Sequence, residues 1–96
     1  MEIITSRNNK TVTEASKLKD KKYRERSGLY CFEGRKLFEE ALVSSAGIET
    51  VFVREDSYIQ NKNLLDRTDA TIYTVSQSVY EKLTEDKAPD GIFAVA

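Results

Sequence analysis

The residues best placed to do chemistry in this chain follow a short apolar run at Leu29–Phe32. A carboxylate, a residue without a Cβ atom and two cations stand there, just before a pattern typical of a helix: Glu33, Gly34, Arg35 and Lys36. A helix N-terminus presents unpaired N–H groups and the positive end of the helix dipole, which together attract phosphate. Arginine can grip a phosphate through two hydrogen bonds or stack on an unstacked base. The junction is therefore a candidate nucleic-acid site.

Each residue of this junction also has a simpler interpretation or a structural consequence. Glu33 could accept hydrogen bonds from a base edge, or it could only complement the dipole of the helix that follows. Arg35 and Lys36 face the positive end of that dipole, which slightly destabilises a helix unless an anion joins them. We therefore expect removal of either cation to stabilise the unbound domain marginally.

The charge of the chain is unevenly distributed, although the formal net charge of its 96 residues is only -1. Residues 1–36 hold ten lysines and arginines against five acids, which is +5, and the other sixty residues carry five cations against eleven acids, which is −6. A polyanion should therefore bind the N-terminal third. Its further candidate contacts are Arg7, Asn9, Lys10, Lys21, Lys22, Arg24 and Arg26.

Two of these candidate groups have alternatives that the sequence leaves open. The cations at 21–26 could form an ordinary solvated helix face, because Asp20 and Glu25 partly neutralise them. Asn9 could equally be a helix cap.

Several function classes are excluded by composition. The chain has no histidine and a single cysteine, Cys31, so common zinc sites, an internal disulfide and a histidine-based proton shuttle are all ruled out. Cys31 is expected to be a small buried hydrophobe. No apolar run approaches the roughly 20 residues of a membrane span, and the polar first residues lack the apolar core of a signal peptide. A cytoplasmic location is expected.

Strands and helices are predicted to alternate along one domain. The expected elements are a helix from Asn9 to about Arg24 broken by Gly28, a strand at Leu29–Phe32, a helix stopped by Gly47, a strand at Ile48–Val53, a helix at Ser57–Asp66, a strand at Thr71–Val75, a helix from Ser76, a turn at Pro89-Asp90-Gly91 and a strand at Ile92–Ala96. This order predicts a three-layer α/β/α sandwich with a mixed sheet of about four strands.

Particular side chains are assigned within these elements. The first helix is capped either by Thr11 with Glu14 or by Asn8 or Asn9, and Asp56 is the expected cap of the third helix. Apolar residues of the helices are expected to face inward: Val12, Ala15, Leu18 and Tyr23 in the first, Leu37, Phe38, Ala41 and Leu42 in the second, Ile59, Leu64 and Leu65 in the third, and Val79, Tyr80 and Leu83 in the fourth. Tyr30 is also expected to pack in the core rather than stack on a base.

The apolar end of the chain suggests that it belongs to a larger protein. Ile92–Ala96 reads as a buried strand with no polar tail, so we expect a domain of a longer polypeptide, with a short natural protein as the alternative.

Five short motifs in order give the chain a family resemblance. They are Ile4-x-Ser6-x-x-Asn9, Lys21-Lys22-Tyr23-Arg24, Phe32-Glu33-Gly34-Arg35, Glu40-Ala41-Leu42 and Pro89-x-Gly91-Ile92. With them the chain resembles the N-terminal substrate-binding domain of SpoU-type (TrmH-family) RNA 2'-O-ribose methyltransferases. The resemblance spans nearly the whole chain.

This resemblance implies a fold like that of the kink-turn-binding ribosomal proteins, in which RNA meets the junction occupied here by Glu33–Lys36. It also implies a knotted catalytic domain downstream of this chain, which would bind S-adenosylmethionine, methylate a ribose of rRNA or tRNA and form a homodimer. No catalytic or cofactor-binding residue can be assigned within residues 1–96. The alternative is a non-catalytic interaction module whose basic patch docks on an acidic protein surface.

Overall fold

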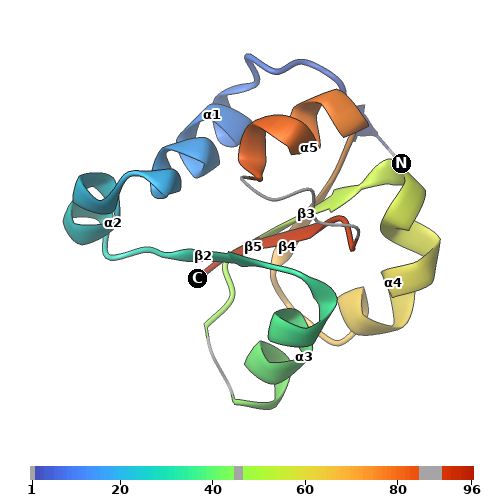
Figure 1. Ribbon diagram of the computed structural model, residues 1–96. Helices are drawn as coiled ribbons and strands as arrows, with labels where there is room; N and C mark the ends of the chain where they lie inside the picture. Colours follow the sequence, from blue (N-terminus) through green and yellow to red (C-terminus); the bar gives the residue numbers. More distant parts are fainter. Residues whose placement is uncertain (1, 45–46, 85–89) are drawn as a thin grey trace.

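The computed structural model describes residues 2–44, 47–84 and 90–96, in which strands and helices alternate as predicted (Figure 1). In chain order the elements are β1 (Ile3–Ile4), α1 (Lys10–Ser16), the 3₁₀ helix η1 (Lys17–Lys19), α2 (Lys21–Ser27), β2 (Cys31–Glu33), α3 (Arg35–Val43), β3 (Thr50–Arg54), the 3₁₀ helix η2 (Glu55–Ser57), α4 (Tyr58–Leu65), β4 (Thr71–Val75), α5 (Gln77–Leu83) and β5 (Ile92–Val95). None of the helices within these ranges is long and apolar enough to cross a membrane.

The strands form one mixed sheet in the order β1-β4-β3-β5-β2. β1, β4 and β3 run parallel, whereas β5 lies antiparallel between β3 and β2. The mixed sheet is confirmed, and the strand absent from the prediction is β1. It consists of only Ile3 and Ile4, paired with Thr74 and Val75, and so offers no alternating pattern to detect.

Helices cover both faces of the sheet, as the α/β/α prediction requires (Figure 1). On β3, the side chain of Phe52 packs in a core with α1 and α5, whereas Val51 and Val53 pack in a second core with α3 and α4. β5 divides in the same way, with Phe93 in the first core and Ile92 in the second. A strand buried on both faces reads as a continuous apolar run, which is why β3 and β5 were predictable.

The predicted helix from Asn9 to Arg24 is wrong in its continuity. Asn9 does cap α1, with its side chain accepting a hydrogen bond from Val12 N at 3.2 Å, but α1 ends at Ser16. At Asp20 the backbone is extended (φ −88°, ψ 122°) and the carboxylate accepts a hydrogen bond from Lys22 N at 2.9 Å, which starts α2. Asp20 is therefore a helix cap and not one of the charges of a continuous face. α2 ends at Ser27, and Gly28 follows it as the C-terminal cap, so the predicted break at Gly28 is confirmed.

The later helices agree with the prediction in type and differ in detail. α3 ends at Val43, before the expected stop at Gly47. Asp56 does not cap α4, because its carboxylate is held by Arg54 at 2.5 Å, and Ile59 is 85% exposed rather than inward. α5 buries Val79, Tyr80 and Leu83 as expected. Outside the helices, Tyr30 is 49% exposed and Cys31 half-buried, so neither is the fully buried core residue that was expected.

The turn before β5 is confirmed at Asp90 and Gly91, while Pro89 lies outside the described residues. Gly91 has a positive φ of 66°, and a Cβ atom there would clash with Ser57 Oγ and lie 3.1 Å from Arg54 Cβ. Two constraints thus require glycine at this position, namely the left-handed backbone and the close approach of η2.

We predict that Gly91→Ala lowers the free energy of unfolding by about 3 kcal/mol, since left-handed strain and a forced shift of Ser57 add together. Gly28→Ala is the matched control: φ is 72° there, and nothing lies within 4 Å of the added Cβ atom. The control should lose only about 1 kcal/mol. Urea denaturation of both variants measures the difference, and equal losses would mean that the contact with η2 is not restrictive.

Candidate nucleic-acid interface

The predicted strand-to-helix junction lies at one edge of the sheet. β2, β3 and β4 end at this edge and β5 begins there, since Glu33 pairs with Phe93, and Arg54 pairs with Val75. Gly34 connects β2 to α3 with a positive φ of 102°, and its N–H donates to Ile92 O at 3.0 Å. The junction is therefore held directly by the start of β5.

An anion does occupy the N-terminus of α3, and it belongs to the protein itself. The Asp90 carboxylate accepts a hydrogen bond from the backbone N–H of Arg35 at 2.9 Å. This carboxylate satisfies a helix donor and complements the dipole. The α3 N-terminus is thus already capped in the unbound domain.

Arg35 also differs from its predicted role as an uncompensated cation. Its guanidinium donates to the carbonyl of Gln60 at 3.1 Å and to Asn61 Oδ1 at 2.9 Å, and it pairs with Glu39 at 3.1 Å. The side chain thereby joins α3 to α4. The expectation that removing Arg35 stabilises the domain is therefore corrected, because the residue bridges two helices.

Asn61 completes this connection from inside the protein. It is 3% exposed, and its side-chain amide donates to Ser57 O at 2.8 Å and to Asp90 O at 3.3 Å while its oxygen accepts from Arg35. A buried amide with these partners fixes the positions of all three. The sequence analysis missed Asn61, since a polar residue in a helix carries no sign of burial.

Glu33 is half-buried and points toward α5. Its carboxylate accepts hydrogen bonds from Thr84 Oγ1 and, at 3.5 Å, from the hydroxyl of Tyr80. Burial and the nearby Glu33 carboxylate raise the pKa of the Tyr80 hydroxyl well above its ordinary value of 10.0. Glu33 therefore helps to join β2 to α5.

The Arg54 guanidinium lies 5.6 Å from the centre of the Tyr80 ring, and its hydrogen bond to Asp56 lowers the pKa of the Asp56 carboxyl group.

Lys36 is the junction cation that remains available to contact a ligand. It is exposed and makes no side-chain hydrogen bond or ion pair in the described part of the chain.

The basic segment formed by α1, η1 and α2 divides in the same way. Arg24 is structural, because its guanidinium donates to the carbonyls of Leu18 at 2.7 Å and Lys19 at 3.1 Å, where the first helical segment ends. Lys21 and Lys22 are exposed, and their ammonium groups have no partner among the described residues. These two lysines thus remain available for phosphate contact.

The remaining predicted cations lie beside α1 and Tyr23. Arg7 precedes α1, and its carbonyl accepts a hydrogen bond from Lys82 Nζ at 2.5 Å, whereas Lys10 begins α1. Arg26 lies 6.0 Å from the centre of the Tyr23 ring.

A hollow of about 260 Å³ connects the basic segment to the junction. Lys19 and Arg24 line it from one side and Glu33 from the other, with Phe32 and Leu83 among its apolar residues. The structure thus brings part of the basic segment and one junction residue to the same surface, although the sequence analysis treated them as separate groups.

Lys82 is a cation that the sequence analysis did not select. Its carbonyl accepts a hydrogen bond from Lys19 Nζ at 2.6 Å, and its own ammonium donates to Arg7 O and to Thr13 Oγ1. It therefore joins α5 to the basic segment. No sequence signal marks it, because it lies in the acidic part of the chain.

Comparison with known proteins places these features in a family context. A family model described as the MRM3-like substrate binding domain matches residues 9–94. The chain is 30% identical over 95 residues to the 23S rRNA (guanosine(2553)-2'-O)-methyltransferase RlmP of Bacillus subtilis (strain 168). That alignment covers 99% of this chain and 37% of the relative, so the chain spans about a third of the relative's length.

Solved structures show the same fold. A crystal structure described as an RNA 2'-O ribose methyltransferase superposes with a TM-score of 0.85 at 25% identity, covering 98% of this chain and 36% of that one. An rRNA methyltransferase from Sinorhizobium meliloti gives a TM-score of 0.81 at 23% identity, with 98% and 36% covered. The same protein is also known in an AdoMet-bound structure.

We predict that Arg35→Ala lowers the free energy of unfolding by about 1 to 2 kcal/mol, because it removes two inter-helix hydrogen bonds and leaves Asn61 partly unsatisfied. Lys36→Ala, the neighbouring control, should change it by less than about 0.5 kcal/mol. Chemical denaturation of the two variants tests this. A more stable Arg35→Ala protein would restore the original expectation of an uncompensated cation.

Proposed function

This chain belongs to the family of MRM3-like substrate-binding domains. We propose that it is the RNA-recognition domain of an S-adenosylmethionine-dependent 2'-O-ribose methyltransferase that acts on rRNA or tRNA. The family match over residues 9–94 carries the proposal. The concentration of cations in residues 1–36 supports it independently, because an excess of +5 favours a polyanion.

The structure suggests different roles for the residues of the proposed RNA-binding surface. In this proposal Arg7, Lys10, Lys21, Lys22, Arg26 and Lys36 contact phosphates. Asn9, Arg24, Glu33, Gly34 and Arg35 shape and hold the backbone that presents them, since their polar groups already have partners within the protein. Phosphate contacts of this kind position an RNA without reading its sequence.

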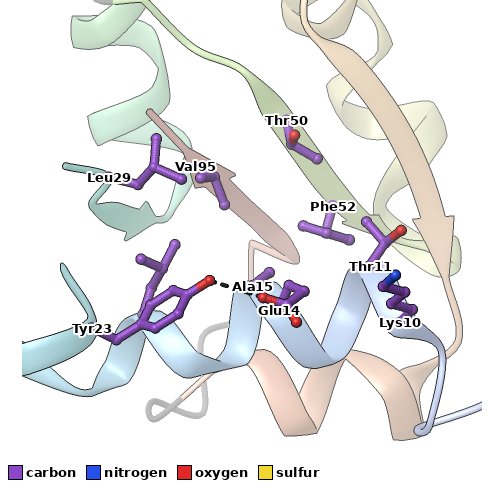
Figure 2. Close-up of a pocket in the computed structure, with 10 residues that line it drawn as sticks. Lys10, Thr11, Glu14, Ala15, Tyr23, Leu29, Thr50, Phe52 and Val95 are labelled. Carbon is purple, nitrogen blue, oxygen red and sulfur yellow. Dashed lines mark hydrogen bonds between the residues drawn. The ribbon is translucent and has the colours of Figure 1, made fainter. Parts of the chain in front are cut away.

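Catalysis is assigned in this proposal to a knotted domain downstream of the chain. The hollow in Figure 2 is a poor fit for S-adenosylmethionine, which carries an adenosine at one end and an ammonium and a carboxylate at the other. This hollow measures about 290 Å³, and half of its lining residues are apolar, with Glu14 as the one carboxylate. We propose further that the complete enzyme acts in the cytoplasm as a homodimer formed through its catalytic domain.

If phosphates are the target, RNA affinity should fall steeply with salt, with each neutralised phosphate adding about −0.7 to −0.9 to the slope of log K against log salt. Lys22→Glu should weaken binding and reduce the slope by about 1. Arg67→Glu, which makes the same charge change on an exposed residue beyond α4, should leave both nearly unchanged. Fluorescence anisotropy with a labelled RNA hairpin measures both quantities.

Two outcomes of this titration would contradict the proposal. Equal effects of Lys22→Glu and Arg67→Glu would indicate unspecific attraction rather than a localised surface. A slope near zero, together with binding to an acidic protein, would favour the interaction-module alternative.

We also predict that the 96-residue chain gives no heat of binding with S-adenosylmethionine in calorimetry, because the proposal places the cofactor site outside it. A dissociation constant in the micromolar range would move that site into this domain.

A further inference from the structure

A hollow lies beside the break between α1 and α2, and none of the roles proposed so far uses it. It measures about 290 Å³ and lies between α1, the start of α2 and the sheet, near the beginning of β3 and the end of β5 (Figure 2). The volume is at the lower end of the range for small-molecule sites.

The lining of this hollow combines apolar residues with the hydroxyl groups of Thr11 and Thr50 and with one carboxylate, Glu14. Among the apolar residues that line it, Leu29 is half-buried, and the others are buried: Ala15, Leu18, Phe52 and Val95. Glu14 lies at the rim, where its Oε2 accepts a hydrogen bond from the Tyr23 hydroxyl at 2.9 Å, drawn as a dashed line in Figure 2. Its Oε1 accepts a hydrogen bond from Lys17 Nζ at 3.2 Å.

The Glu14 carboxylate keeps acceptor capacity after these two bonds. Its two oxygens offer about four lone-pair positions, of which Tyr23 and Lys17 use two. The hydrogen bond from Tyr23 lowers the pKa of Glu14, so the group is ionised at neutral pH and acts only as an acceptor. A polar ligand in the hollow must therefore bring donors to Glu14.

Cations lie near this carboxylate and the Tyr23 ring. Lys10 lines the hollow, and Lys17 Nζ and the Arg26 guanidinium lie 5.9 and 6.0 Å from the centre of the Tyr23 ring. Lys17 is already paired with Glu14, which leaves Lys10 and Arg26 without an ion-pair partner among the described residues. Two such cations beside the hollow suit a ligand that has a flat body and phosphates attached. An unstacked nucleotide has this composition, whereas an apolar protein segment would leave the cations unpaired.

We propose that the hollow holds one unstacked guanine base of the bound RNA, with Glu14 accepting hydrogen bonds from its Watson–Crick edge. Among the four bases only guanine presents two adjacent donors, N1–H and the N2 amino group, on that edge, and these match the two oxygens of a carboxylate. The base lies against Leu29 and the Tyr23 ring, the half-buried apolar and aromatic residues of the lining, while Lys10 and Arg26 contact the flanking phosphates. The inference rests on the proposed RNA-binding function and adds base selectivity to it.

The test compares two labelled RNA hairpins that differ only in one bulged nucleotide, guanosine or adenosine. The native chain should bind the guanosine hairpin about tenfold more tightly, the size of one well-placed two-bond contact. Glu14→Gln should abolish this preference, because an amide offers only one acceptor oxygen. Glu25→Gln removes the same charge from α2, outside the lining of the hollow, and should keep the preference. Tyr23→Phe should also keep it, since both carboxylate oxygens remain.

Nuclear magnetic resonance locates the contact separately from affinity. Guanosine 5'-monophosphate should shift the amide signals of Ala15, Thr50 and Phe52, and adenosine 5'-monophosphate should shift them much less. Native chain that binds both hairpins equally, or a preference that survives Glu14→Gln, would overturn the guanine pocket and leave the RNA-binding function standing. Absence of binding to either hairpin, with no shifts from the nucleotide, would overturn both. Shifts caused by an apolar helical peptide but not by the nucleotide would assign the hollow to a protein partner instead.

Discussion

The two-residue turn at Asp90 and Gly91 is the constraint on which the arrangement of the candidate interface depends. Its carboxylate caps α3, the carbonyl of Asp90 accepts from the buried Asn61, and the carbonyl of Gly91 accepts from the backbone N–H of Arg54 at 2.8 Å. Four elements are thus fixed through two residues: α3, α4, the end of β3 and the start of β5. Since Gly91 is packed against Ser57, the turn has little room to move relative to η2.

This constraint explains why the junction in the structure differs from the junction expected from sequence. Two adjacent cations at a helix start suggested an external anion, and the sequence gives no means of knowing that an aspartate 55 residues away supplies one. Long-range polar contacts of this kind depend on the tertiary fold, whereas propensity and periodicity describe only neighbours in the chain. Arg35 is the clearest case, because the same guanidinium that suits a phosphate also suits a helix carbonyl and a buried amide.

The layers and most elements could be predicted because their signals are local. β3 and β5 are apolar runs buried on both faces, and α5 has its cap at Ser76 and its apolar residues on one face. The two elements that were predicted wrongly also have local explanations. β1 is too short to show a period, and the break at Asp20 was hidden because lysines and arginines on both sides of it are good helix formers. The hollow beside Tyr23 is lined by residues of α1, α2, β3 and β5, and the sequence alone does not reveal that these elements meet there.

The position of β5 in the sheet has a consequence for the order of folding. β5 is the last strand along the chain, yet it lies between β3 and β2, and β2 pairs with no other strand in the described residues. During synthesis at roughly 5 to 20 residues per second, β2 and the segment before it must therefore wait for residues 92–95 to emerge from the ribosome before they can join the sheet. Until then the nascent chain exposes the edge of β3 and the apolar side chains that pack against β5. The sheet is therefore completed late, by pairing between strands far apart in the sequence, and we expect slow folding for a domain of this size.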